Sequence, residues 1–373
     1  MAIEKRVYSD LPVPPGEYLA EVLATKGMAQ AELARRIGRP IQAVNEIIKG
    51  EKAITPATAL QLEKALDVPA NIWVGLESRY QLIKARLEEK KHLQRESAYL
   101  PRTPYKQLAD LDCVRRTRDN EHKIGELHRF YGVSSLANLP GIKAYQASFR
   151  CAAARGASSF ALAAWLRCAE LRAAEVKTSP FDKGKLREVL DKIRSLSTKK
   201  LAEFMPELER HLAGCGVVMI LLPHFQKTYA HGATFWLGQD KAVLLMSFRG
   251  KWADVFWFSL FHEIGHILLH QKKTYIDGGR ILPELARQEK EADEFAANSL
   301  IEARRFDEFV RKGDFSEAAV EGFAGDLGIP KGIVVGRLQH EGLLKYDSEL
   351  NNRRQGQGRP RGDRSILRET GQG

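Results

Sequence analysis

The sequence predicts a mainly α-helical protein with one small β-sheet, organised as an N-terminal helix-turn-helix bundle followed by an α+β domain. Amphipathic patterns with apolar residues three and four positions apart cover most of the 373 residues, as in packed helices. After Gly214 the pattern changes to short apolar runs separated by turn residues, which is typical of a small sheet. The predicted strands are Val217–Leu222, Ala233–Leu237 and Ala242–Ser247.

The composition is that of a globular protein with an acidic partner. Hydrophobic residues make up 44% of the chain and charged residues 28%. A net charge of +11 and a pI of about 9.4 favour nucleic acid as that partner. No apolar segment is long enough for a membrane helix, and Met1–Pro12 lacks the apolar centre of a signal peptide. We therefore expect a cytoplasmic protein with no membrane partner.

The four cysteines are scattered, with no Cys-x-x-Cys pair. This spacing indicates neither a disulfide framework nor a cysteine zinc site, so buried thiols are expected. The cysteines are Cys113, Cys151, Cys168 and Cys215.

The N-terminal region contains a helix-turn-helix pattern. Gln30–Ile37 is predicted to be a short helix, Gly38 makes the turn, and Ile41–Lys49 forms a second helix with Val44 and Ile47 turned inward. Such a unit places a recognition helix in the major groove of DNA. The same spacing would also suit a compact helical hairpin without DNA-binding function.

The exposed face of this unit carries side chains suited to DNA. Gln42 and Asn45 have amide groups that can pair with adenine edges, while Arg39 suits phosphate or guanine. Gln30, at the start of the first helix, could donate to a phosphate. The candidate DNA-binding residues are Gln30, Arg39, Ile41, Gln42 and Asn45.

Helical patterns dominate the rest of the chain. Leu82–Arg95 is predicted to be a charged, exposed helix, and 124–200 to be mostly helical. After the strands, helices are expected at Trp252–His270 and Leu285–Ile301, joined by a loop around Asp277–Arg280. Further expected helices are Phe160–Val176 and two short ones within 316–345, which should pack on the preceding domain rather than bind DNA.

The helix Trp252–His270 carries a His-Glu-x-x-His motif. His262 and His266 lie four residues apart, so both imidazoles project from one face and can reach one ion. Glu263 lies about 100° round the helix, where it can act on a water without ligating the metal. The motif therefore predicts a metallopeptidase site with Glu263 as general base.

A third ligand is needed, because zinc in hydrolases takes three protein ligands. His270 lies one turn further along, and three histidines on one straight helix line up rather than converge. A carboxylate from the later helix is favoured: Glu289 could ligate while Asp293, four residues on, accepts the free ring N–H of a zinc histidine. Glu291 is a less favoured alternative. Manganese or iron would also suit two histidines and one carboxylate.

Three strings in this domain resemble the ImmA/IrrE family of metallo-endopeptidases: HEIGHILLH, EKEADEFAANSLI and, upstream, GATFWL. The resemblance covers about residues 215–301, and more loosely 124–346. It implies a gluzincin-like zinc peptidase domain, although the family usually has asparagine where Asp293 stands and proline where Glu302 stands. The implied zinc ligands are His262, His266 and Glu289, with Glu263 as general base.

Residues Pro15–Ala85 resemble the XRE-type helix-turn-helix of HigA-like plasmid-maintenance antidotes, around the turn, in KGEKAIT and at the tryptophan before the closing helix. That family binds operator DNA as a dimer, which implies double-stranded operator DNA as partner and a homodimer formed through this unit. Pro40 stands where most relatives carry a small polar residue, and proline suits the first turn of a helix.

The expected domains follow from these patterns and resemblances. They are 1–95 (helix-turn-helix), 96–200 (helical connection), 201–312 (zinc metallopeptidase), 313–350 (small helical unit) and 351–373 (disordered basic tail).

The combination implies a cytoplasmic DNA-binding regulator whose zinc-dependent endopeptidase domain cleaves a repressor or an antitoxin. An alternative is a non-proteolytic antitoxin that represses its own operon and binds a toxin; the intact Glu263 argues against it. Hydrolysis of a small amide is a third possibility. His231 or Tyr229 could stabilise an oxyanion, and the edge of the Ala233–Leu237 strand could bind an extended substrate by strand addition.

Overall fold

The computed structural model describes residues 11–146, 158–247, 253–277, 283–345, 348 and 350. The chain divides into two compact units, Met1–Ser97 and Ala98–Gly373. The expected basic tail, residues 351–373, lies outside the described residues, as do Trp252 and the 278–280 part of the expected loop.

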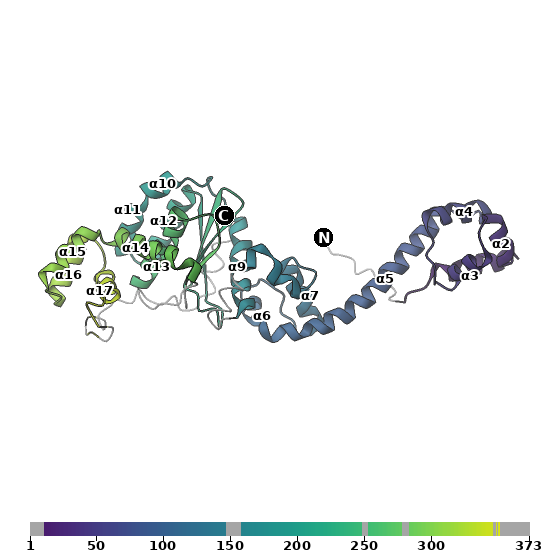
Figure 1. Cartoon of the computed structure of the whole chain (residues 1–373), viewed down its shortest axis with the longest axis horizontal. Helices are drawn as coiled ribbons and strands as arrows, with labels where there is room; N and C mark the ends of the chain where they lie inside the picture. Colours follow the sequence, from purple (N-terminus) through teal and green to yellow (C-terminus); the bar gives the residue numbers. More distant parts are fainter. Residues whose placement is uncertain are drawn as a thin grey trace. The chain divides into compact units, whose positions relative to one another are not determined.

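The first unit is a bundle of helices (Figure 1). These helices pack around one apolar core. Leu19, Leu33, Val44, Leu62 and Trp73 come from five different helices and are fully buried. The two predicted helices of the helix-turn-helix are present, and the predicted charged helix is the second half of one long helix. The helices are α1 (Pro15–Thr25), α2 (Gln30–Ile37), α3 (Ile41–Ile48), α4 (Pro56–Leu66) and α5 (Ala70–Glu96).

Two glycines shape the helix-turn-helix. Gly38 ends α2 in the left-handed region, with φ of +64°, which lets the chain turn sharply into α3. Gly16, in α1, lies directly against the backbone carbonyl groups of Ile47 and Ile48 at the end of α3. Because a Cβ atom at position 16 would collide with these carbonyls, α1 and α3 can approach this closely only with glycine there.

The second unit combines helices with one sheet (Figure 1). No helix in the described part of the chain is long and apolar enough to span a membrane. Short 3-10 helices occur at Ser97–Arg102, Leu136–Gly141, Leu196–Thr198 and Pro283–Leu285. The α-helices are α6 (Tyr105–Asp110), α7 (Asn120–Tyr131), α9 (Ser159–Glu175), α10 (Lys183–Glu188), α11 (Leu190–Ser195), α12 (Leu201–Gly214), α13 (Ala253–Leu269), α14 (Ala286–Leu300), α15 (Ala303–Lys312), α16 (Glu317–Leu327) and α17 (Lys331–His340).

The sheet has four strands in the order β1-β3-β2-β4. Strand β3 runs parallel to β1 and antiparallel to β2, which in turn pairs antiparallel with β4. The three predicted strands are confirmed within one residue at each end. The strands are β1 (Val217–Leu222), β2 (Gly232–Leu237), β3 (Lys241–Ser247) and β4 (Tyr275–Asp277).

Strand β4 corrects two expectations. The sequence placed Asp277 at the start of a loop, whereas it ends this short strand. Because β4 pairs with Gly232–Thr234, that part of β2 is not a free edge, so the expectation of strand addition there is wrong for these three residues. The sequence did not predict β4 because a strand of three residues is too short to show the alternating apolar pattern by which strands are recognised.

Each face of the sheet packs on a different set of helices, because successive side chains of a strand point to opposite sides. Leu244 and Met246 of β3 lie in a core shared with α12, α13 and α14. Val243 and Leu245 face the other way, into a core shared with α9. The sheet is therefore the middle layer of the unit.

The two C-terminal helices belong to the first of these cores. Val334 and Leu338 of α17 are fully buried and lie in the same cluster as Trp257 of α13. As expected, this helical pair packs on the preceding domain. The finer domain boundaries at residues 200 and 312 stay predictions.

We predict that Gly16→Ala lowers the free energy of unfolding of the first unit by about 1–3 kcal/mol, because the new methyl group overpacks the contact between α1 and α3. Thermal unfolding followed by circular dichroism, with hydrogen exchange of the α3 amides, would measure it. Gly75→Ala is the matched control: Gly75 lies in helix α5, and a Cβ atom there would meet nothing within 4 Å, so alanine should not destabilise. Equal stability of the two variants would contradict the prediction.

Candidate functional site

Helices α13 and α14 meet at a glycine. A Cβ atom at Gly265 would lie 3.3 Å from the Cα atom of Ala292 and 3.1 Å from the ring of Phe295. Only small residues allow two helix backbones to approach so closely. This contact brings the motif histidines of α13 next to the carboxylates of α14.

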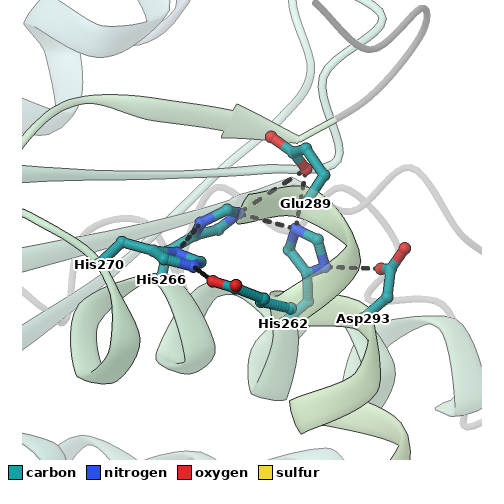
Figure 2. A network of polar contacts seen from close by, with 6 residues as sticks. His262, His266, His270, Glu289 and Asp293 are labelled. Carbon is teal, nitrogen blue, oxygen red and sulfur yellow. Dashed lines mark hydrogen bonds and ion pairs between the residues drawn. The ribbon is translucent and has the colours of Figure 1, made fainter. Parts of the chain in front are cut away.

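The structure brings together the three predicted metal ligands (Figure 2). The Nε2 atoms of His262 and His266 are 3.0 Å apart. An Oε2 atom of Glu289 lies 3.3 Å from His262 Nε2 and 3.7 Å from His266 Nε2. All three residues are buried. Three donor atoms thus converge on one point from two helices.

Further side chains contact the Nδ1 atoms of the two ligand histidines (Figure 2). Asp293 accepts a hydrogen bond from Nδ1 of His262, at 2.8 Å. Nδ1 of His266 lies 3.0 Å from Nδ1 of His270, whose Nε2 is 3.1 Å from a Glu291 carboxylate oxygen. Neither His270 nor Glu291 belongs to the group of three: His270 contacts and orients the ligand histidine His266, and Glu291 in turn contacts His270.

Strand β4 adds a contact that the sequence did not indicate. The ring of Tyr275 stacks on the ring of His266, with centroids 4.4 Å apart and planes 13° apart. Asp277, at the end of the same strand, raises the pKa of both His262 and Glu263 through its negative charge, as a lesser cause. The only sequence signal for either residue was its place shortly after the motif helix.

Glu263 is fully buried, with 0% of its surface exposed. Its carboxylate lies against Gly232 of β2: a Cβ atom there would be 3.0 Å from the Glu263 carboxyl carbon. Among the described residues, both carboxylate oxygens lack a hydrogen-bond partner. Burial raises the pKa of this carboxyl well above its ordinary value. A buried, unpartnered carboxylate is costly to the fold, which points to a functional role.

The pKa values of His262, Glu289 and His266 depend on the contacts that these three residues make with one another. Burial lowers the pKa of His262, but its bonds to Asp293 and Glu289 outweigh this and raise the pKa to about 11. Burial raises the pKa of Glu289, but its contacts with His262 and His266 outweigh this and bring the pKa to about 2. Burial lowers the pKa of His266. A proton on His262 therefore balances Glu289 in the metal-free chain.

The donor set fits a metal ion. When Asp293 fixes the proton of His262 on Nδ1, the Nε2 lone pair points to His266 and Glu289. Two imidazole nitrogens and a carboxylate oxygen, all within 4.8 Å of one another, then face the same point. A cation at that point would take the place of the balancing proton on His262 and would stabilise the lone pairs and the negative charge that converge there. The residues that could hold it are His262, His266 and Glu289.

The two oxyanion candidates lie just before β2. His231 precedes Gly232, and its backbone bonds to Asp277 and Ser247 beside the sheet. Tyr229 is 43% exposed and has a φ of +54°, in the left-handed region. Their role at the site stays a prediction.

The candidate DNA-binding residues lie together at the surface of the first unit. Gln30, Ile41, Gln42 and Asn45 are exposed, and Ile41 keeps 54% of its surface accessible. Arg39 differs from the others, because its Nε donates to Gln61 of α4 at 2.7 Å. This bond holds the guanidinium beside the turn, so Arg39 is pre-oriented by the fold.

The two compact units match two different protein families. Residues 19–73 match the helix-turn-helix family, and residues 226–339 match the IrrE N-terminal-like domain. Each compact unit of the chain is thus similar to a different family. The IrrE-like match contains Glu263 and all three converging donors, and the helix-turn-helix match contains α2 and α3.

Similar solved structures cover only a small part of the chain. An addiction module antidote protein of a HigA family from Coxiella burnetii is 32% identical, over 22% of this chain and 92% of that one, with a TM-score of 0.21. The Pseudomonas aeruginosa antitoxin HigA, solved with the higBA promoter, is 30% identical, over 23% and 94%, with a TM-score of 0.22. No curated protein matches the chain.

We predict that Asp293→Ala weakens zinc binding by about 10- to 100-fold, because His262 loses the acceptor that fixes its tautomer. Competition with a chromogenic chelator would measure the affinity. Asp293→Asn keeps an acceptor oxygen and should retain most of it. Glu294→Ala is the matched control, since that carboxylate lies exposed on the same helix and pairs with Lys290 rather than with the candidate ligands. Unchanged affinity in Asp293→Ala would rule out the orienting role.

Proposed function

We propose that the protein is a DNA-binding regulator whose IrrE-like domain is a zinc-dependent endopeptidase that cleaves a repressor or an antitoxin. The observation that carries this proposal is the buried Glu263 carboxylate, which lies beside the three converging donors and has no hydrogen-bond partner among the described residues. A site built only to bind a metal has no need of a fourth residue, with an unpartnered carboxylate, beside its three donors. A hydrolytic site needs such a group as its base.

His262, His266 and Glu289 would hold the zinc ion. When bound, zinc supplies the Lewis acidity that polarises a peptide carbonyl and activates water. Glu263 takes the proton from the attacking water and passes it to the leaving amine. Burial, which raises the pKa of Glu263, makes its ionised form a stronger base. Asp293 and His270 keep the two imidazoles oriented during the reaction.

The helix-turn-helix domain would bring this activity to an operator. Gln42 and Asn45 lie on the exposed side of α3, while Val44 and Ile47 fix the helix to the core. Amide side chains at the start of a recognition helix suit adenine edges in the major groove. A homodimer formed through this domain would read two half-sites.

We predict that Glu263→Gln abolishes cleavage while metal binding persists, because glutamine fills the same space but cannot accept a proton. Loss of a general base lowers the turnover rate by about 100- to 10,000-fold. The assay is cleavage of the proteins encoded beside this gene, followed by gel and mass spectrometry with zinc or manganese present. Glu294→Gln, exposed on α14, is the control and should cleave like the wild type.

Two outcomes separate the candidate functions. Cleavage of a neighbouring repressor or antitoxin by the wild type alone supports the peptidase and names its substrate. If nothing is cut, while wild type and Glu263→Gln bind metal and operator equally well, the non-proteolytic antitoxin becomes the better proposal.

We predict that Asn45→Ala weakens binding to the DNA upstream of this gene by roughly 5- to 150-fold, the value of about 1–3 kcal/mol for one bidentate base contact. Fluorescence anisotropy at fixed salt would measure the dissociation constant. Asn71→Ala is the matched control, because Asn71 is also an exposed asparagine on a helix of this unit, in α5. Equal loss in both variants would contradict the assignment of α3 as recognition helix.

A further inference from the structure

Two cysteine thiols meet on the side of the sheet away from the candidate metal centre. Cys113 follows α6, and Cys168 lies in the middle of α9, which packs on the opposite face of the sheet from α13. Their Sγ atoms are 3.0 Å apart. This is about 1 Å longer than a disulfide bond, so a small movement would join them. The sequence, with 55 residues between them, gave no sign of this pairing.

The backbone fixes Cys113 at this position. Asp112 adopts a φ of +57°, in the left-handed region, which turns the chain sharply at the end of α6. The amide of Cys113 then donates to the carbonyl of Leu108 at 2.9 Å. The thiol is thereby directed towards α9 rather than into solvent.

The two thiols have different surroundings. Cys168 is fully buried, whereas Cys113 is only partly buried. A hydrogen bond from Cys168, with a smaller contribution from the guanidinium of Arg172, lowers the pKa of Cys113. Burial raises the pKa of Cys168 well above its ordinary value. The pair therefore has one thiol that ionises readily and one that stays protonated beside it.

A surface cavity leads to the more acidic thiol. Its volume is about 340 Å³, and Cys113 forms part of its wall. The arginines Arg115 and Arg116 line the same cavity and are exposed. A small polar oxidant that enters this cavity comes next to Cys113, whereas Cys168 is fully buried and does not line the cavity.

We propose that Cys113 and Cys168 form a peroxide-reactive dithiol, in which Cys113 is attacked first and Cys168 closes an intramolecular disulfide. A reactive cysteine is one that is accessible, partly ionised and close to a resolving thiol. Cys113 meets all three conditions through its cavity wall, Arg172 and Cys168. Cys215 meets none of them among the described residues: it is 2% exposed, and burial raises its pKa.

The reaction balances with hydrogen peroxide or an organic hydroperoxide as oxidant. The Cys113 thiolate attacks the hydroxyl oxygen of the peroxide, the O–O bond breaks, and hydroxide or alkoxide leaves. That leaving group takes up the proton that the Cys113 thiol released on ionising and becomes water or an alcohol, and Cys113 is left as a sulfenic acid. The Cys168 sulfur then attacks the Cys113 sulfur, and the S–O bond breaks. The hydroxyl leaves as water with the Cys168 proton. Two thiols lose two electrons in total, and the peroxide gains them.

The test is a peptide map of the full chain after brief treatment with hydrogen peroxide, with free thiols blocked before digestion. Trypsin should release residues 107–115 joined to residues 168–172 by a disulfide. The joined pair should be about 2 Da lighter than the two reduced peptides together, and dithiothreitol should separate it. Residues 151–155 and 211–227, which carry Cys151 and Cys215, should stay unlinked.

Three variants distinguish reaction from proximity. In Cys168→Ser, Cys113 should stop as a sulfenic acid that dimedone traps; in Cys113→Ser, Cys168 should stay unmodified. Arg172→Gln should slow disulfide formation by roughly three- to tenfold, because the thiolate loses a nearby cation. As a control, Cys215→Ser should leave the map unchanged. A linkage to Cys151 or Cys215 instead, or Cys113 oxidised to a sulfinic acid with Cys168 still reduced, would overturn the proposal.

Discussion

The contact between Gly265 of α13 and Ala292 of α14 is the constraint on which the candidate metal centre depends. Because Gly265 has no side chain, α13 and α14 approach until the backbone at Gly265 packs against the backbone at Ala292. Glu289 lies one turn before Ala292 and thereby comes to 3.3 Å from His262. A larger residue at the contact would separate the helices and leave the histidines without their carboxylate. Close packing of apolar surface thus sets the distances between polar donor atoms.

The contact between α13 and α14 gathers ionisable side chains in a buried site, where water does not solvate their charges. Four titratable groups are buried together, and in the metal-free chain a proton on His262, whose pKa is about 11, offsets Glu289. Among the described residues the Glu263 carboxylate oxygens have no hydrogen-bond partner, and Gly232 of β2 lies directly against this side chain. A bound cation would stabilise all of these groups at once. The fold therefore accepts an electrostatic cost here that favours metal binding and keeps a base available.

The sheet lies between the candidate metal site and the pair of cysteine thiols. Its α13 face supports the metal donors, and its α9 face supports the Cys113 and Cys168 thiols. Alternation along β2 and β3 gives each face its own core. The helix-turn-helix domain, with its own core around Leu33 and Trp73, folds as a separate compact unit.

The sequence by itself determined what depends on helical and strand periodicity: the pairing of His262 with His266, the turn at Gly38 with the exposed face of α3, and three of the four strands. These features are local, because residues within one or two turns have a fixed relation whatever surrounds them. Only the tertiary structure decided which acidic residue converges on the histidines, that His270 binds Glu291 instead, that β4 covers part of β2, and that Cys113 meets Cys168. Each of these joins segments whose separation is set by packing, and a linear pattern does not encode packing distances.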